Sequence, residues 1–153
     1  MENEKTIDVL NNLIQINNDR IEGYETATKE TEEQDLKSFF GELTQTSLQC
    51  NNELSHEVTK LGGTPTDSTK TTGKFFRVYM DLKAALTGKD RKAILNSCEY
   101  GEDVALETYE KVLSDDAENL TAELKGIIKT QHTLLKADHD KVKFMKDALV
   151  EQD

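Results

Sequence analysis

The stretch RKAILNSCEYGEDVALETYEKVL, residues 91–113, carries a carboxylate on its apolar side. A helix turns by about 100° per residue, so the apolar residues of this stretch gather on one face, and Glu102 falls near the middle of that face. Those residues are Ile94, Leu95, Cys98, Ala105, Leu106, Tyr109, Val112 and Leu113. Burial of an unpaired carboxylate is unfavourable, so Glu102 needs a hydrogen-bond partner, a proton or a bound cation. Which of these three it has is the functional question that the sequence raises.

The composition favours one all-α domain over residues 1–153. The chain is 35% hydrophobic and 32% charged, and its single proline and eight glycines leave little to separate strands. A net charge of −11 disfavours nucleic acid and anionic membranes as partners. The first residues do not resemble a signal peptide and no apolar run is long enough to span a bilayer, so we expect a cytoplasmic protein. No feature identifies a small-molecule substrate.

The spacing of apolar residues predicts four long helices, at about residues 4–29, 32–61, 91–113 and 117–150, and a shorter one at about 73–86. The last helix is expected to turn Ile127 and Leu134 inward. Gly62 ends the second helix, because a C-terminal glycine can adopt positive φ. The following connection, residues 62–89, is long enough to run the length of a bundle. We therefore predict a four-helix bundle with a long crossover that contains the short helix, so that the second and third long helices run parallel.

Polar residues on the other helices fall at the depth of Glu102, which predicts a buried polar layer near the middle of the bundle. Its expected members are Asn17, Tyr24, Thr46, Glu102, Tyr109 and Gln131. The simplest interpretation is structural: Glu102 accepts hydrogen bonds from Gln131, Tyr109 or Tyr24, and the layer fixes the register of the helices.

The alternative is a metal site. Di-iron bundles use a Glu on each of two helices and a Glu-x-x-His pair on each of the other two. The last helix here reads Lys129-x-x-His132, with a lysine in place of a carboxylate, so the pattern is incomplete. This hypothesis places iron or manganese at Glu102 with Glu22, Glu25, Glu42 or His132. Nucleophilic chemistry at Cys98 would need a base that the pattern does not place beside it.

Several short motifs follow one another along the chain. They are Leu10-Asn11-Asn12-Leu13-Ile14, residues 19–24, Leu61-Gly62-Gly63-Thr64-Pro65, residues 82–88, Cys98-Glu99-Tyr100-Gly101-Glu102-Asp103, Gln131 and His139-Asp140. In this order they resemble the bacterial ferritin-like family of four-helix-bundle proteins of unknown function. The resemblance implies a ferritin-like fold, and with the incomplete metal pattern it leads us to expect a non-enzymatic, structural or stress-associated protein. The alternative is a metal-dependent oxidase, storage or peroxide-handling protein.

We also expect a homodimer that forms through the short helix or the face beside it. Phe76 and Met80 lie off the apolar strip of that helix, which therefore has apolar groups on two sides. Only one side can face its own bundle, and aromatic and Met side chains are enriched at protein interfaces.

Overall fold

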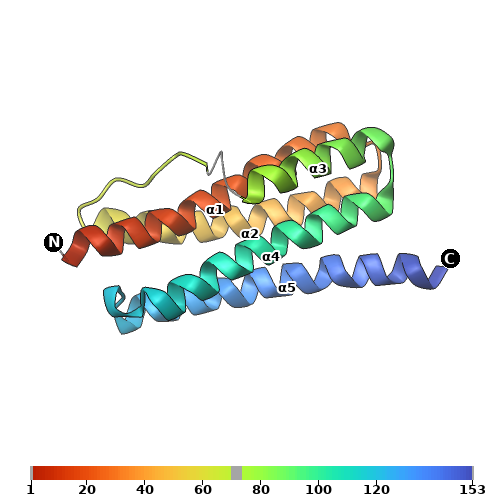
Figure 1. Ribbon diagram of the computed structural model, residues 1–153. Coiled ribbons are helices and arrows are strands. Elements are labelled where there is room, and N and C mark those ends of the chain that lie inside the picture. The colour runs from red at the N-terminus through yellow and green to blue at the C-terminus, as the bar shows by residue number, and fades with distance from the viewer. Residues whose placement is uncertain (1, 70–73, 153) are drawn as a thin grey trace.

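The computed structural model describes residues 2–69 and 74–152. Its elements are α1 (Glu2–Glu30), α2 (Gln34–Lys60), α3 (Lys74–Gly88), α4 (Arg91–Asp115), the short 3-10 helix η1 (Ala117–Asn119) and α5 (Ala122–Gln152) (Figure 1). Neither described range contains a strand, which confirms the predicted all-α fold. In those ranges no helix is both long and apolar enough to cross a membrane.

The four long helices follow the predicted crossover topology. Tyr24 of α1 stacks on Phe40 of α2, with ring centroids 5.8 Å apart, as expected for an antiparallel hairpin. Arg91 at the start of α4 pairs with Asp35 at the start of α2, with Nη2 and Oδ2 2.6 Å apart. The first residues of α2 and α4 thus lie at the same end, so these two helices run parallel (Figure 1). The arrangement is the crossover bundle and not an up-down-up-down one.

The crossover begins where two glycines end α2. Gly62 has a φ of 85°, and the amide of Gly63 donates to the carbonyl of Val58 at 3.0 Å. A Cβ on Gly63 would lie 2.8 Å from Cδ1 of Ile7, so the segment leaves α2 in close contact with α1. Gly62 thus fills the role of helix terminator that the sequence predicts for it.

Amide side chains of α1 then hold the crossover segment along that helix. Asn11 donates to the carbonyl of Thr64 at 3.2 Å and accepts from the amide of Thr66 at 3.0 Å. One and two turns further on, Gln15 donates to Oγ of Ser68 at 2.8 Å and Asn18 donates to the carbonyl of Ser68 at 2.9 Å. The crossover is therefore attached to α1 over about two turns of that helix.

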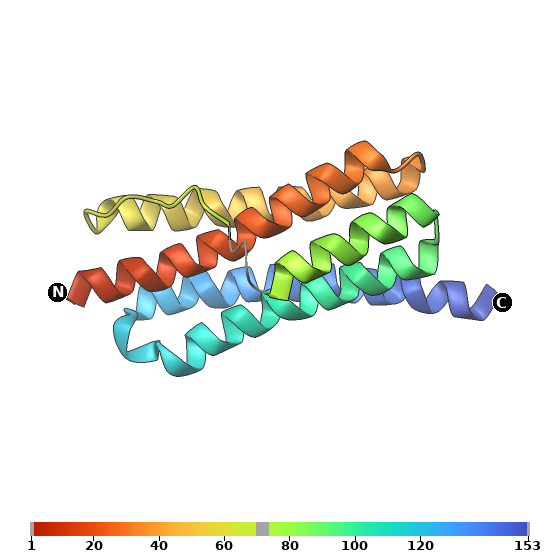
Figure 2. The same cartoon turned by 45° about the horizontal axis from the view of Figure 1, so that its top comes forward.

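The helix α3 packs against α1 and α4, where Leu82 and Leu86 are buried (Figure 2). Met80 is 50% exposed, as the predicted dimer contact requires. Phe76 lies outside the residues whose side chains are described, so a dimer through α3 stays a prediction. In the described ranges no helix covers the opposite edge of the bundle, between α2 and α5.

The apolar core forms two clusters, one toward each end of the bundle. The first includes Leu13, Leu54 and Ile128, and the second includes Phe40, Leu95 and Val142. Buried polar side chains of all four long helices lie between the two clusters.

Two expectations about the last helix were wrong. It is not continuous from residue 117, because Leu120 is extended, with φ −119° and ψ 134°, and separates η1 from α5. The inward residues are Ile128 and Leu135, which are 0% and 1% exposed, whereas Ile127 and Leu134 are half-buried. The buried stripe of α5 steps by four and three residues through Leu124, Ile128, Gln131, Leu135, Asp138 and Val142. The adjacent apolar pairs Ile127–Ile128 and Leu134–Leu135 are compatible with either register, and packing in the bundle buries the second member of each pair.

Candidate functional site

A fully buried arginine lies at the centre of the polar layer, and sequence analysis missed it. Arg20 is 0% exposed. It belongs to a stripe of α1 that steps by three and four residues through Leu10, Leu13, Asn17, Arg20, Tyr24 and Ala27, all of them buried. The neighbouring Ile21 is apolar, but the structure leaves it half-buried. The spacing from Asn17 and Tyr24 was the signal that could have found Arg20.

The guanidinium of Arg20 binds Glu102 with two parallel hydrogen bonds. Nη2 donates to Oε1 at 2.7 Å and Nε donates to Oε2 at 2.9 Å. Oε2 also accepts a hydrogen bond from the hydroxyl of Tyr24 at 2.8 Å. The three options for Glu102 are thereby resolved: the carboxylate has a buried cation and a hydrogen-bond donor, both supplied by α1.

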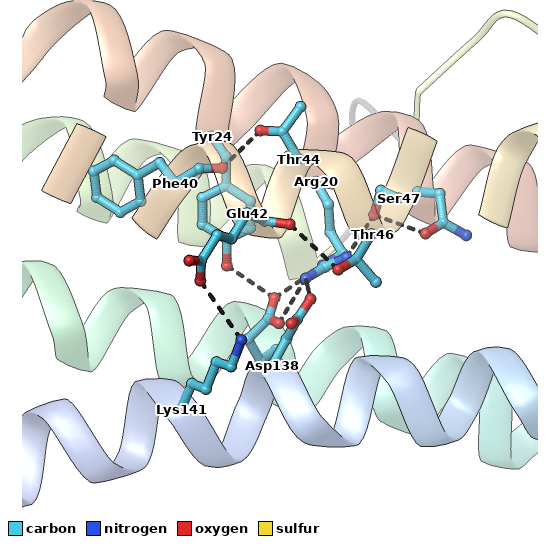
Figure 3. A network of polar contacts seen from close by, with 11 residues as sticks. Arg20, Tyr24, Phe40, Glu42, Thr44, Thr46, Ser47, Asp138 and Lys141 are labelled. Atoms are coloured by element: carbon cyan, nitrogen blue, oxygen red, sulfur yellow. Dashed lines mark hydrogen bonds and ion pairs between the residues drawn. The ribbon is translucent and has the colours of Figure 1, made fainter. Parts of the chain in front are cut away.

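The same guanidinium reaches the other two long helices. Nη2 donates to Oδ2 of Asp138 on α5 at 3.1 Å, and Nη1 donates to the hydroxyl of Ser47 on α2. Figure 3 shows the guanidinium between Ser47 and the carboxylate of Asp138. Arg20 of α1 therefore contacts α2, α4 and α5 through one planar group, whose several N–H donors suit this role.

Burial and charge oppose each other at these groups. Burial alone would lower the pKa of Arg20, but the charges of Glu102 and Asp138 help to raise it above its ordinary value, so the guanidinium stays charged. Burial raises the pKa of Asp138, and the charge of Arg20 offsets this only in part. Burial also raises the pKa of Tyr24, so its phenol stays a donor. The cluster of Arg20, Glu102 and Asp138 is neutral when Asp138 carries a proton, and burial favours that form.

A second, uncharged network lies beside the first. The amide of Asn17 donates to the hydroxyl of Tyr109 at 2.8 Å, and that hydroxyl donates to Oε1 of Gln131 at 2.7 Å. Ser47 joins the two networks, because its hydroxyl donates to Oδ1 of Asn17 at 2.8 Å. Of the three donors predicted for Glu102, only Tyr24 reaches it in the described contacts, and Tyr109 and Gln131 bond to each other.

The structure places five of the six residues proposed for the polar layer in the interior. Asn17, Tyr24, Glu102, Tyr109 and Gln131 are each at most 2% exposed. Thr46 is half-buried, and its hydroxyl donates to the carbonyl of Glu42 at 3.3 Å. Burial has the largest effect on the pKa of Asp138 and raises it, and the charge of Arg20 lowers it. A hydrogen bond with Thr46 lowers this pKa further. It therefore lies at the edge of the layer.

The residues proposed as metal ligands do not meet at Glu102. Glu22 and Glu25 are exposed on α1. Glu42 is exposed on α2 and pairs with Lys141 at 3.5 Å, and His132 pairs with Glu110 at 3.0 Å on the outside of the α4–α5 hairpin. The described residues contain no group of three His, Cys, Asp or Glu side chains that could hold a metal ion. Since Arg20 engages both oxygens of Glu102, these residues do not fit a di-metal centre, and iron or manganese binding stays a prediction.

The two thiols are buried and protonated. Cys50 and Cys98 are free cysteines, 0% and 1% exposed. Burial raises the pKa of Cys50 to about 11. Burial and then the charge of Glu102 raise the pKa of Cys98. Because the thiolate is the nucleophile, neither group is activated at neutral pH.

The fold and the site define an all-α bundle whose long helices meet at a buried charged layer. The chain belongs to the family described as a domain of unknown function, DUF2383, whose model matches residues 5–115. This agrees with the expected membership of a helical family of unknown function. The match includes Arg20 and Glu102, while Gln131 and Asp138 on α5 lie beyond it. Among curated proteins, no relative matches the chain.

Proposed function

We propose that this protein is a non-enzymatic, ferritin-like bundle with a structural or stress-associated role, in which a fixed guanidinium takes the place of a metal centre. The observation that carries the proposal is the contact between Arg20 and Glu102, with two hydrogen bonds of 2.7 and 2.9 Å at side chains 0% and 1% exposed. A ferritin-like relationship is supported by the crossover topology and by the mid-bundle position of the polar layer.

The contacts of the charged groups support a structural rather than a catalytic role. Arg20 and Glu102 have no exposed surface at which a substrate could bind, and the hydroxyl of Tyr24 is a donor to Glu102. A general acid or base must lie within hydrogen-bond reach of the group it serves. Here the carboxylate of Glu102 already accepts hydrogen bonds from Arg20 and Tyr24 of the same chain. The layer instead specifies which helix faces meet, since any other arrangement would leave buried charges unpaired.

Metal analysis separates this proposal from a metal-dependent oxidase, storage or peroxide-handling protein. The chain is purified without chelator, offered iron(II) or manganese(II), desalted and measured for bound metal beside Glu102→Gln and His132→Ala. We expect substoichiometric metal that neither substitution changes. Stoichiometric metal that is lost in Glu102→Gln would overturn the proposal and favour the metal-dependent alternative.

A further inference from the structure

The edge between α2 and α5 carries an apolar groove. The groove has a volume of about 540 Å³, and its lining includes Phe39 and Glu42 of α2 and Ala137, Lys141 and Phe144 of α5. Phe39 forms part of the buried core at 6% exposure, whereas Phe144 is 75% exposed, the highest value among the large apolar residues whose side chains are described. Burial of the exposed Phe144 ring against a second molecule would be favourable.

The position of the groove in the fold explains why it is open. The edge between α1 and α4 is covered by α3, as Figure 2 shows. The edge between α2 and α5 has no such cover within residues 2–69 and 74–152. A helix laid along this edge would complete the bundle on its second side.

The sequence of α5 is complementary to itself at this groove. Ala137, Asp140, Lys141 and Phe144 all line it. Two copies of α5 can pack antiparallel about a two-fold axis that passes between positions 140 and 141. Positions equally far on either side of the axis then face each other, so Phe144 faces Ala137 of the second copy and Lys141 faces Asp140 of the second copy. The large ring meets a small side chain and each lysine meets a carboxylate, and the symmetry repeats both contacts.

We propose that the α2–α5 groove binds α5 of a second copy of this chain, antiparallel, with Phe144 of each copy inserted beside Ala137 of the other. This inference goes beyond the proposed function and does not depend on it. It also differs from the dimer through α3 that Phe76 and Met80 suggested.

The local charge permits this contact although the whole chain has a net charge of −11. At the groove, Lys141 pairs with Glu42 and Lys136 pairs with Asp140, so two lysines balance two carboxylates there. Asp138 points inward to Arg20. Repulsion between more distant charges is screened beyond about 8 Å at physiological ionic strength.

The ion pairs that now border the groove can rearrange. Lys141 pairs with Glu42 at 3.5 Å (Figure 3), and Lys136 pairs with Asp140 at 2.9 Å. All four side chains are more than half exposed, so these pairs add little stability and can be shared with a second copy. An interface between one helix and one wall of a groove buries less than about 1,200 Å² in total, which is at the low end for specific interfaces. We therefore expect a dissociation constant on the order of 10 µM.

Sedimentation equilibrium from about 1 to about 300 µM, which brackets that constant, tests the proposal at physiological salt. Wild type should pass from monomer to dimer, and Phe144→Asp should weaken the dimer by at least about tenfold, as loss of a central aromatic anchor does. Tyr100→Asp is the matched control, because Tyr100 is also exposed, at 49%, but lies on α4. Circular dichroism confirms that each variant is folded. A monomer throughout, a dimer that Phe144→Asp leaves intact, or equal loss in Tyr100→Asp would each overturn the proposal.

Charge reversal tests the register. Lys141→Asp should weaken the dimer because it places two carboxylates opposite each other, and Asp140→Lys should do so with two ammonium groups. The double variant restores opposite charges across the axis and should recover most of the wild-type affinity. A double variant no tighter than either single one would overturn the antiparallel register.

Discussion

Arg20 and Glu102 lie 82 positions apart in the sequence and form a two-point ion pair in the interior, with side chains 0% and 1% exposed. The pair joins α1 to α4, which are not consecutive helices. A buried pair of this kind adds little net stability compared with apolar residues of similar size, but loss of one partner leaves an uncompensated charge. The energetic importance of each residue therefore depends on the other.

The first prediction is a double-mutant cycle. Glu102→Leu and Arg20→Met should each lower the free energy of unfolding by about 3–5 kcal/mol, because Arg20→Met leaves Glu102 without a cation and Glu102→Leu leaves Arg20 with Asp138 as its one acidic partner. The double variant should cost less than either single change. Urea unfolding followed by circular dichroism measures all four proteins. Additive losses in the double variant would contradict a coupled pair. With only neutral donors around Glu102, as the sequence suggested, Glu102→Leu would have been close to neutral.

The second prediction concerns pH. The pKa of Asp138 is raised from its ordinary value of 3.8, chiefly by burial, so the folded state favours the protonated form. Its contribution to stability is present below pH 3.8 and is lost as the pH rises through the higher folded-state pKa. The free energy of unfolding of wild type relative to Asp138→Asn should therefore fall as the pH rises above 3.8. Other carboxylates are common to both proteins and cancel. A difference that rises with pH would mean that Arg20 outweighs burial at this site.

The third prediction concerns the uncharged network. Tyr109→Phe removes the hydroxyl that accepts from Asn17 and donates to Gln131, and so leaves two buried polar groups without that partner. It should lower the free energy of unfolding by about 1–3 kcal/mol. Tyr100→Phe is the control and should change stability by less than about 0.5 kcal/mol, since Tyr100 is an exposed tyrosine. Equal effects of the two changes in urea unfolding would show that the Tyr109 hydroxyl is not part of a required network.

The fourth prediction concerns the thiols. Cys50 and Cys98 should resist alkylation by iodoacetamide at pH 8 in the native protein, because both are buried and the pKa of Cys50 is about 11. Both should react after unfolding in urea. Gln49→Cys places an exposed thiol on α2 and serves as the reactive control. Rapid native labelling at either natural cysteine, measured by mass spectrometry, would contradict the buried positions.

Periodicity within single helices predicted much of the fold. The apolar stripe that follows Arg91 and contains Glu102 predicted α4. The end of α2 at Gly62 and the long connection after it predicted the crossover, and with it the parallel direction of α2 and α4. Glu102 and Gln131 were recognised because a polar residue inside an otherwise apolar stripe is conspicuous.

The partner of Glu102 was missed for a physical reason. The side chains of two adjacent residues on a helix point in directions about 100° apart. Where one is apolar and the other is arginine, the apolar residue is the one expected to be buried, because arginine is seldom found in the interior. Arg20 and Ile21 are such a pair, and only the three- and four-residue spacing of Arg20 from Asn17 and Tyr24 favours the arginine. Ile127 and Ile128 pose the same choice on α5. Both members of that pair are isoleucine, so only the rotation of α5 in the packed bundle decides between them, and periodicity within one helix could not supply it.

The position of the charged layer between the α1–α2 hairpin and the α4–α5 hairpin has a consequence for the order of folding. Each hairpin can form from local contacts, but Arg20 meets Glu102 and Asp138 only when the two hairpins dock. A slip of one helical turn, about 5.4 Å, would bring Cys98 or Leu106 opposite the guanidinium and leave a charge buried without a partner. The apolar clusters alone would tolerate such a slip far better. Arg20 thus disfavours arrangements in which the two hairpins are misaligned by a turn, because such arrangements would bury its charge without a partner.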